Sequence, residues 1–159
     1  MSLIIILVLS CFFFDRISKI LVITNMSVFD SFEVINNFFS ITYARNFGAA
    51  FSFFKGGRYI FIMVAILVIV ALFIFLKNNL KKINILDKIC VSLILGGSLG
   101  NLLDRIIYGY VIDFLDFNIF GYNYPIFNFA DSFIVVGTII LLINSIRNDV
   151  NVKNKSGRE

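Results

Sequence analysis

The chain has 159 residues, of which 59% are hydrophobic, 16% aromatic and only 15% charged. Soluble globular domains are about 45–50% apolar and about 25% charged, and a chain this short has no interior large enough to bury the excess. Lipid is therefore expected to surround most of it. The sequence contains no histidine, which excludes Ser-His-Asp and Cys-His catalysis and any metal site with histidine ligands. Its two cysteines lie in apolar runs and form neither a metal-binding nor a disulfide pattern.

Four apolar segments approach the length that crosses a hydrocarbon core, which takes roughly 20 residues of helix. They cover residues 3–23, 59–76, 83–103 and 125–146. The first segment faintly resembles a cleaved signal peptide, but no basic residue precedes it and the apolar pattern resumes beyond Lys19, so we interpret it as a retained helix. We expect an all-α membrane protein, with a single four-helix membrane domain at 1–148 and a polar, frayed cytoplasmic tail at 149–159.

The basic residues predict the orientation of these spans. The 77–88 loop and the chain from residue 147 onward carry eight Lys and Arg residues, whereas the outer segments 25–58 and 104–124 are together longer and carry four. Short loops rich in Lys and Arg stay in the cytoplasm, so both termini are predicted to be cytoplasmic. Topology and lipid head groups then explain the net charge of +4, and nucleic acid is not expected as a partner.

Residues 32–54, in the first outer segment, are rich in aromatic and β-branched side chains. That composition favours short strands. We therefore expect a small extracytoplasmic β-rich element at the membrane surface.

Charged side chains within the spans are functional candidates, because each costs about 2.5–3.5 kcal/mol at mid-bilayer on insertion scales. Asp15 and Lys19 are four residues apart, which is the spacing for an ion pair on one helix face. A structural pair that neutralises both charges and a direct role in chemistry are both open.

A second group of polar residues closes the third span. Asn101, Asp104 and Arg105 are spaced to share a helix face, and a capping cluster at the membrane interface is the alternative to a functional role. The glycines just before them are predicted to let another helix approach closely. They are Gly96, Gly97 and Gly100.

Two further aspartates complete the set of candidates. Asp113 follows the third span, and Asp131 lies in the first turns of the fourth, where Pro125 suits the first helical turn and Asn128 points the same way as Asp131. Two carboxylates about 4 Å apart repel by about 4 kcal/mol at an effective dielectric near 20, which separates their pKa values by about three units. One would activate water while the other donates a hydrogen bond to a scissile carbonyl.

Other functions use the same residues. A small proton-coupled transporter could use these carboxylates as a relay, although such proteins place ionisable groups near the midplane, whereas here they cluster at one side. A structural subunit could use its asparagines and aspartates to hold helices together.

Five sequence blocks occur in a fixed order along the chain. They are Asp15-Arg16-Ile17-Ser18-Lys19, Tyr43 through Phe51, Gly96 through Arg105, Gly109 through Phe114, and Phe127 through Ser132. In this order they resemble the motifs of the bacterial lipoprotein signal peptidases, or type II signal peptidases. Among these motifs are Asp-x-x-Ser/Thr-Lys, Asn-x-Gly-Ala-Ala-Phe and Gly-Gly-Ala-x-Gly-Asn-x-x-Asp-Arg. The chain departs from them by having Ser98 in place of an alanine and by lacking tryptophan.

The resemblance implies an intramembrane aspartyl endopeptidase of the bacterial inner membrane. It would remove signal peptides from diacylglyceryl-modified prolipoproteins by cutting before the lipidated cysteine, without a metal or cofactor, and globomycin would inhibit it. Asp113 and Asp131 would be the catalytic dyad. The resemblance further implies that a second set of residues binds substrate or supports the site: Asn46, Gly48, Asn101, Asp104, Arg105, Asn128, Asp15 and Lys19. We expect a monomer that contacts prolipoprotein and membrane lipids.

Overall fold

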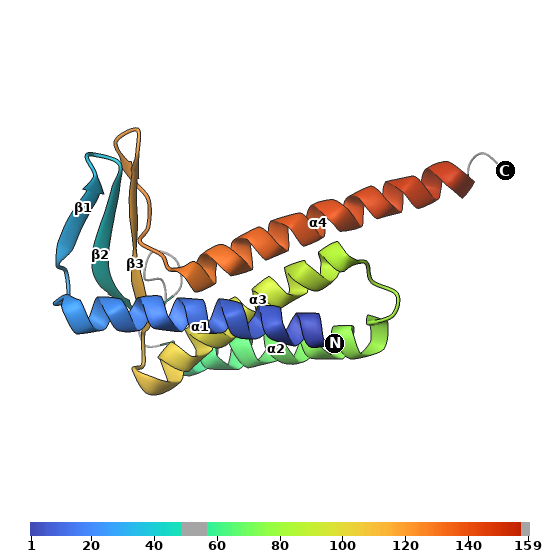
Figure 1. The fold of residues 1–159 in the computed structure, drawn as a ribbon, viewed down its shortest axis with the longest axis horizontal. Coiled ribbons are helices and arrows are strands. Elements are labelled where there is room, and N and C mark those ends of the chain that lie inside the picture. The colour runs from blue at the N-terminus through green and yellow to red at the C-terminus, as the bar shows by residue number, and fades with distance from the viewer. Residues whose placement is uncertain (49–56, 157–159) are drawn as a thin grey trace.

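The computed structural model describes residues 1–48 and 57–156. Four helices form a bundle, with a four-stranded sheet at one end (Figure 1). The helices are α1 Ser2–Asn25, α2 Arg58–Asn79, α3 Ile85–Ile107 and α4 Phe129–Ser156. The strands are β1 Ser31–Ile35, β2 Phe39–Asn46, β3 Val111–Ile119 and β4 Tyr122–Asn123. The four predicted helices are confirmed.

The helices identify a membrane protein. Within the described residues, α2, α3 and the Phe129–Arg147 part of α4 are long and apolar enough to cross a bilayer. Helix α1 is not among these three, and Asp15, Arg16 and Lys19 fall within its length. Many large apolar side chains of α1, α2 and α4 are exposed on the outside of the bundle, which is expected where lipid is the solvent.

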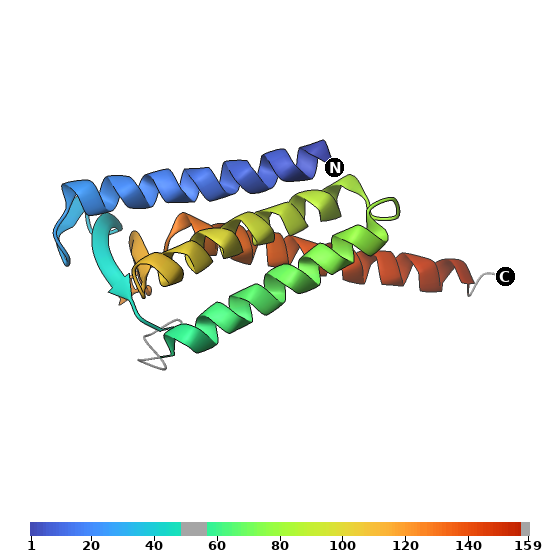
Figure 2. The same ribbon diagram turned by 90° about the horizontal axis from the view of Figure 1, so that it is seen from below.

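Helix α3 lies at the centre of the bundle, where it contacts each of the other three helices (Figure 2). The predicted glycines make these contacts possible. A Cβ atom on Gly96 would lie 2.6 Å from the Cβ of Cys11 on α1, and one on Gly97 would collide with the carbonyl oxygen of Ala130 on α4. The prediction that this block lets other helices approach closely is therefore confirmed.

The sheet is antiparallel, in the order β1-β2-β3-β4. Strands β1 and β2 confirm the predicted β-rich element as far as residue 46, and residues 49–54 of the prediction lie outside the described residues. Strands β3 and β4, which follow α3, were not predicted. The first five residues of β3 are all buried, so they lack the alternation that marks a strand with one solvated face.

Helix α4 differs from the prediction at both ends. Pro125 is not in its first turn, because Phe127 exchanges backbone hydrogen bonds with Leu115 of β3 and keeps the chain extended until the helix begins at Phe129. The tail predicted to be frayed is helical to Ser156. No proline or glycine interrupts the chain between Arg147 and Ser156, so the helix is free to continue.

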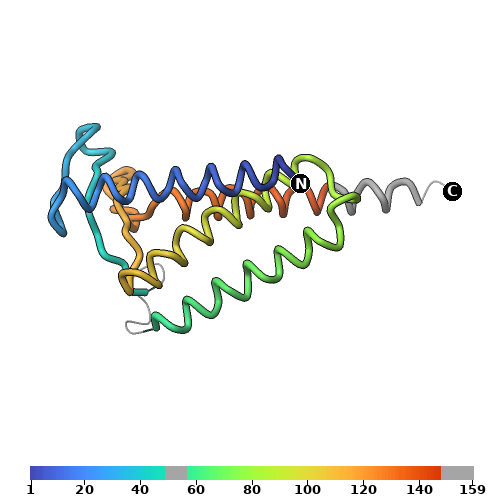
Figure 3. The backbone as a smooth tube through the Cα atoms, turned by 60° about the horizontal axis from the view of Figure 1, so that its bottom comes forward, coloured from blue at the N-terminus to red at the C-terminus, as the bar shows by residue number. Residues whose placement is uncertain are grey.

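The two ends of the bundle carry different parts of the fold. The sheet lies at one end, and the N-terminus and the α2–α3 connection lie at the other (Figure 3). A buried apolar cluster joins the sheet to the end of α1 and consists of Val22, Tyr43, Ile112, Phe114 and Leu115. This cluster fixes β3 against the bundle, so that the strand carries Asp113 to the helix ends.

Candidate active site

A cavity of about 460 Å³ lies where the sheet meets α3 and α4. Its lining combines polar and apolar side chains from both parts of the fold. They are Asn46, Gly48, Asn101, Arg105, Val111, Asp113, Tyr124, Pro125, Ile126, Phe127, Asp131 and Val135. The two predicted aspartates therefore line one cavity, although they lie on different elements and 18 residues apart in the sequence.

Asp113 lies on β3 and is only 2% exposed. Its Oδ1 accepts a hydrogen bond from Asn128 Nδ2 at 2.7 Å, and its Oδ2 accepts one from Asn46 Nδ2 at 2.9 Å. Burial, and next the charge of Asp131, raise the pKa of Asp113 to about 7. The sequence argument attributed such a shift to repulsion between carboxylates, whereas removal from water is the larger cause.

Asp131 lies in the first turn of α4, in a reciprocal pair with Asn128. The backbone N–H of Asp131 donates to Asn128 Oδ1 at 2.9 Å, and the backbone N–H of Asn128 donates to Asp131 Oδ2 at 3.2 Å. This is a capping-box arrangement, which satisfies backbone donors that a helix start leaves unpaired. The cap also brings the Asn128 amide to Asp113, so that one residue contacts both carboxyl groups.

The other oxygen of Asp131 accepts a hydrogen bond from Asn101 Nδ2 at 2.7 Å. The direction of this bond follows from Lys19, whose Nζ donates to Asn101 Oδ1 at 2.9 Å. Because an ammonium group has no acceptor, Asn101 must present its oxygen to Lys19 and its amide N–H groups to Asp131. Asn128 Nδ2 reinforces this orientation with a hydrogen bond to the same Asn101 oxygen.

A buried cluster of four charges lies behind the cavity. Lys19 contacts Asp15 Oδ2 at 2.8 Å and Asp104 Oδ2 at 2.9 Å, and Arg16 contacts Asp104 Oδ1 at 2.6 Å. The predicted pairing of Asp15 with Lys19 is confirmed. The cluster has no net charge, as expected for ionisable groups buried in a membrane protein.

The same carboxylates also fix the backbone around the cavity. Asp15 Oδ1 accepts from the backbone N–H of Ala130 at 2.9 Å, and Asp104 Oδ2 accepts from that of Ile112 at 3.2 Å. Ala130 directly precedes Asp131 in the sequence, and Ile112 directly precedes Asp113. Each structural carboxylate therefore holds the backbone that carries one cavity aspartate.

Arg105 extends along the cavity wall. Its Nη1 donates to the carbonyl oxygen of Asn101 at 3.3 Å, its Nη2 donates to that of Gly48 at 3.4 Å, and its guanidinium lies 5.3 Å from the ring centroid of Phe61. The Gly48 N–H in turn donates to Asn46 Oδ1 at 3.0 Å. Arg105 thus lies beside the two aspartates and contacts the chain that carries Asn46.

The ten residues predicted for the site form one connected region: seven line the cavity or contact the aspartates directly, and Asp15, Lys19 and Asp104 lie behind them. The sequence analysis missed Arg16 and Tyr124. Arg16 is a charge inside an apolar segment without an obvious partner, which was an available signal. Tyr124 stands in an extended linker, and no pattern in the sequence distinguishes it from the other tyrosines.

These features define a class of protein: a helical membrane protein with paired aspartates in one cavity. The particular family follows from three comparisons. A sequence model of the family described as signal peptidase (SPase) II matches residues 7–147. A lipoprotein signal peptidase of Staphylococcus aureus (strain bovine RF122 / ET3-1) is 41% identical over 142 residues, which cover 89% of this chain and 86% of the relative. The lipoprotein signal peptidase of Staphylococcus aureus strain Newman is also 41% identical, over 143 residues that cover 89% of this chain and 86% of the relative.

Solved structures agree with the sequence comparisons. A bacterial membrane enzyme determined by the in meso method at 2.3 Å resolution superposes with a TM-score of 0.88 and 37% identity, over 95% of this chain and 92% of that one. A second, at 1.9 Å resolution, has a TM-score of 0.81 and 38% identity, over 91% and 92% of the two chains. The chain belongs to the signal peptidase II family, the membrane aspartic peptidases that remove signal peptides from lipoproteins. Nothing in the comparisons supports the transporter hypothesis.

Proposed function

We propose that Asp113 and Asp131 are the catalytic pair of this peptidase. The observation that carries the proposal is that both carboxyl groups line one cavity and both accept hydrogen bonds from Asn128, one from its side-chain amide and one from its backbone N–H. The pKa of Asp113, raised to about 7, supports its holding a proton at neutral pH. Asp131 receives hydrogen bonds from an oriented amide and from a backbone N–H, and such donors stabilise an ionised carboxylate.

The reaction follows from this division of roles. The ionised Asp131 takes a proton from a water molecule as the water oxygen attacks the scissile carbonyl, while the protonated Asp113 donates a hydrogen bond to the carbonyl oxygen. The tetrahedral intermediate then collapses, the C–N bond breaks, and a proton passes from the pair to the leaving amine of the cysteine. The products are a free signal peptide and a lipoprotein with a new N-terminus.

Three asparagines are proposed to position the pair. Asn46 and Asn128 donate to Asp113, and Asn101 donates to Asp131. The side chains of Asn101 and Asn128 are already occupied by these contacts, which favours positioning over the substrate binding that the family resemblance implied for them. Arg105 retains donors towards the cavity, and we propose that it binds a substrate carbonyl.

The remaining features of the proposal concern the membrane. We propose that α1 is a fourth span, because Asp15 and Lys19 are fully buried while its other faces carry exposed apolar side chains. The active site would then face outward, with both termini in the cytoplasm of a bacterial inner membrane. We further propose that the substrates are diacylglyceryl-modified prolipoproteins, which are cut before the lipidated cysteine. The protein would be a monomer in contact with membrane lipids, and globomycin would inhibit it.

The test uses conservative substitutions in the purified protein. Asp113→Asn and Asp131→Asn should each lower kcat on a lipidated prolipoprotein by at least about 10²-fold, the range in which general acid–base groups contribute. Asp116→Asn is the matched control, because Asp116 lies on the same strand as Asp113 but contacts Thr42 outside the cavity. The proposal is refuted if either dyad variant keeps wild-type turnover, or if the control loses as much activity.

A further inference from the structure

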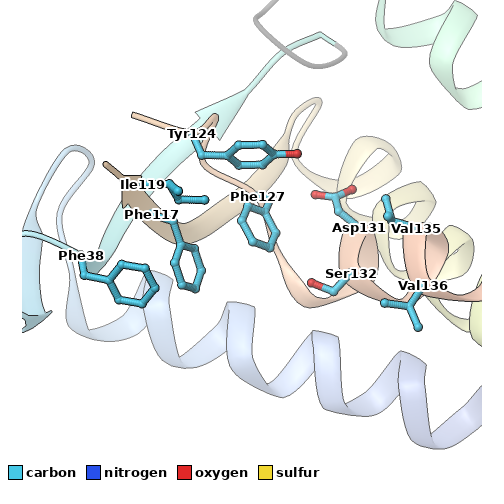
Figure 4. A pocket seen from close by; sticks show the side chains of 9 residues that line it. All are labelled: Phe38, Phe117, Ile119, Tyr124, Phe127, Asp131, Ser132, Val135 and Val136. Atoms are coloured by element: carbon cyan, nitrogen blue, oxygen red, sulfur yellow. The ribbon is translucent and has the colours of Figure 1, made fainter. Parts of the chain in front are cut away.

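An apolar groove of about 500 Å³ lies beside the catalytic cavity, in the angle between β3 and α4 (Figure 4). The sheet contributes aromatic and aliphatic side chains to one wall, and α4 contributes the other wall. The lining residues are Phe38, Phe117, Ile119, Tyr124, Phe127, Asp131, Ser132, Val135 and Val136. Only Asp131 and Ser132 among them carry fully polar side chains, and both lie at the beginning of α4.

The groove is continuous with the cavity that holds both aspartates. Tyr124, Phe127, Asp131 and Val135 line both spaces. In Figure 4 the hydroxyl group of Tyr124 and the carboxyl group of Asp131 point towards one another at the junction. A ligand in the groove would therefore have one end beside a proposed catalytic group.

The α4 wall of the groove belongs to the exposed apolar surface of that helix, which is the surface that lipid would cover. Val135 and Val136 are 54% and 48% exposed, and the apolar surface of α4 continues beyond them through Ile139 and Leu142. The strands run across the helix axes at this end of the bundle (Figure 1), so the sheet covers the groove on the side away from the helices. An occupant can enter from the lipid without crossing water.

The shape and chemistry of the groove select its occupant. A transmembrane helix is about 10 Å across, so a space of this volume would hold only about one turn of it. An extended hydrocarbon chain has the smaller cross-section that the groove suits, and the lining provides dispersion contacts without basic groups for a phosphate. The hydroxyl group of Tyr124, at the junction with the catalytic cavity, is a donor suited to an ester oxygen of an acylated glycerol.

We propose that this groove binds an acyl chain of the diacylglyceryl group on the substrate cysteine. The inference rests on the proposed function, because it takes the lipidated prolipoprotein as the substrate. A chain held between β3 and α4 fixes the lipidated cysteine relative to Asp131, whereas a chain in fluid bilayer would leave the scissile bond free to move. The groove thus acts as a specificity site for lipidation, and its contribution is positional because hydrocarbon is equally apolar inside the groove and outside it.

The test fills the groove from a position outside the catalytic cavity. Val136→Trp introduces a large side chain into the groove, and Ile139→Trp is the matched control, one turn further along α4 and also half exposed. For a prolipoprotein with two palmitoyl chains, Val136→Trp should lower kcat/KM by about tenfold to a hundredfold, the cost of misplacing a substrate by about 1 Å. For the same prolipoprotein with two butyryl chains the loss should be less than about threefold, since short chains reach little of the groove.

Photo-crosslinking gives a readout that does not depend on turnover. A prolipoprotein with a diazirine in mid-chain, mixed with the Asp113→Asn protein in bicelles, should label Phe117, Ile119 or Val136, as located by mass spectrometry. Label on α2, or from the apolar core of the signal peptide instead of its lipid, would overturn the proposal. So would equal labelling of the groove by a diazirine phosphatidylglycerol in the presence of saturating substrate, which would indicate a general lipid site.

The kinetic outcomes separate the groove from the proposed function. Equal losses for both chain lengths in Val136→Trp, or a matching loss in Ile139→Trp, would overturn the groove assignment while leaving the peptidase proposal intact. If the wild-type protein cuts neither prolipoprotein, the proposed function fails, and crosslinking alone then decides whether the acyl chain binds in the groove.

Discussion

Lys19→Met would test how the buried charges support the active site. The ammonium group of Lys19 is fully buried and makes three contacts, with Asp15, Asp104 and Asn101. Methionine keeps the length and apolar stem of lysine but leaves Asp104 with Arg16 alone and removes the cation that pairs with Asp15. Breaking a buried pair by removing one partner costs about 3–5 kcal/mol. At about 2–4 °C per kcal/mol for a chain of this size, the midpoint of thermal unfolding in detergent should fall by about 10 °C.

Two further variants make this prediction specific. Lys77→Met, at an exposed position near the end of α2, should change the midpoint by less than about 2 °C, since surface substitutions cost under about 0.5 kcal/mol. The double variant Lys19→Met/Asp15→Asn restores charge neutrality and should recover about half of the lost stability. It should recover little peptidase activity, because Asn101 then loses the Lys19 donor that orients its amide towards Asp131 and keeps only the longer hydrogen bond from Asn128. If Lys19→Met unfolds at the same temperature as Lys77→Met, the buried cluster is not the support described above.

Three other predictions follow from the same contacts. Peptidase activity should fall as the pH rises through about 7, because Asp113 then loses its proton. Asn46→Ala removes a donor that favours the ionised carboxylate, so the pKa of Asp113 should rise. The pH at which activity falls should then increase by about half a unit to one unit. Gly97→Ala should destabilise the bundle by about 1–3 kcal/mol in detergent unfolding, because the added Cβ collides with the α4 backbone. In intact cells, a cysteine placed at Phe120, which is fully exposed at the tip of the sheet, should react with an impermeant maleimide while one at Lys81 should not; the reverse pattern would refute the proposed orientation.

Local features of the structure could be predicted from the sequence because they depend on residues that are close together along the chain. The Asp15–Lys19 pair follows from helical spacing and is present as an ion pair. The close approach at Gly96 and Gly97 follows from the absence of side chains and is also present. The four helices follow from apolar length alone.

What the sequence could not predict depends on contacts between distant segments. The first five residues of β3 are buried where the strand contacts α1 and α3, so their pattern does not alternate, and the pairing of β3 with β2 places Asp113 opposite Ala44. The start of α4 was misplaced because the pairing of Phe127 with β3 overrides the helix preference of Pro125. The partners of Asp104 lie on α1 and at the start of β3, 88 residues and eight residues away, and no local spacing reveals such contacts.

The most direct test of the central claim is to give the purified protein one prolipoprotein in two forms, with and without diacylglyceryl on the processing cysteine, and to identify the products by mass spectrometry. Lipidation anchors the cysteine at the interface, with about 0.8 kcal/mol for each buried CH₂, and presents the preceding peptide bond at the depth of Asp113 and Asp131. The account predicts cleavage immediately before the cysteine in the lipidated form, no cleavage of the other form, and no product from Asp131→Asn. Equal cleavage of both forms, or cleavage of the lipidated form by Asp131→Asn at the wild-type rate, would contradict it.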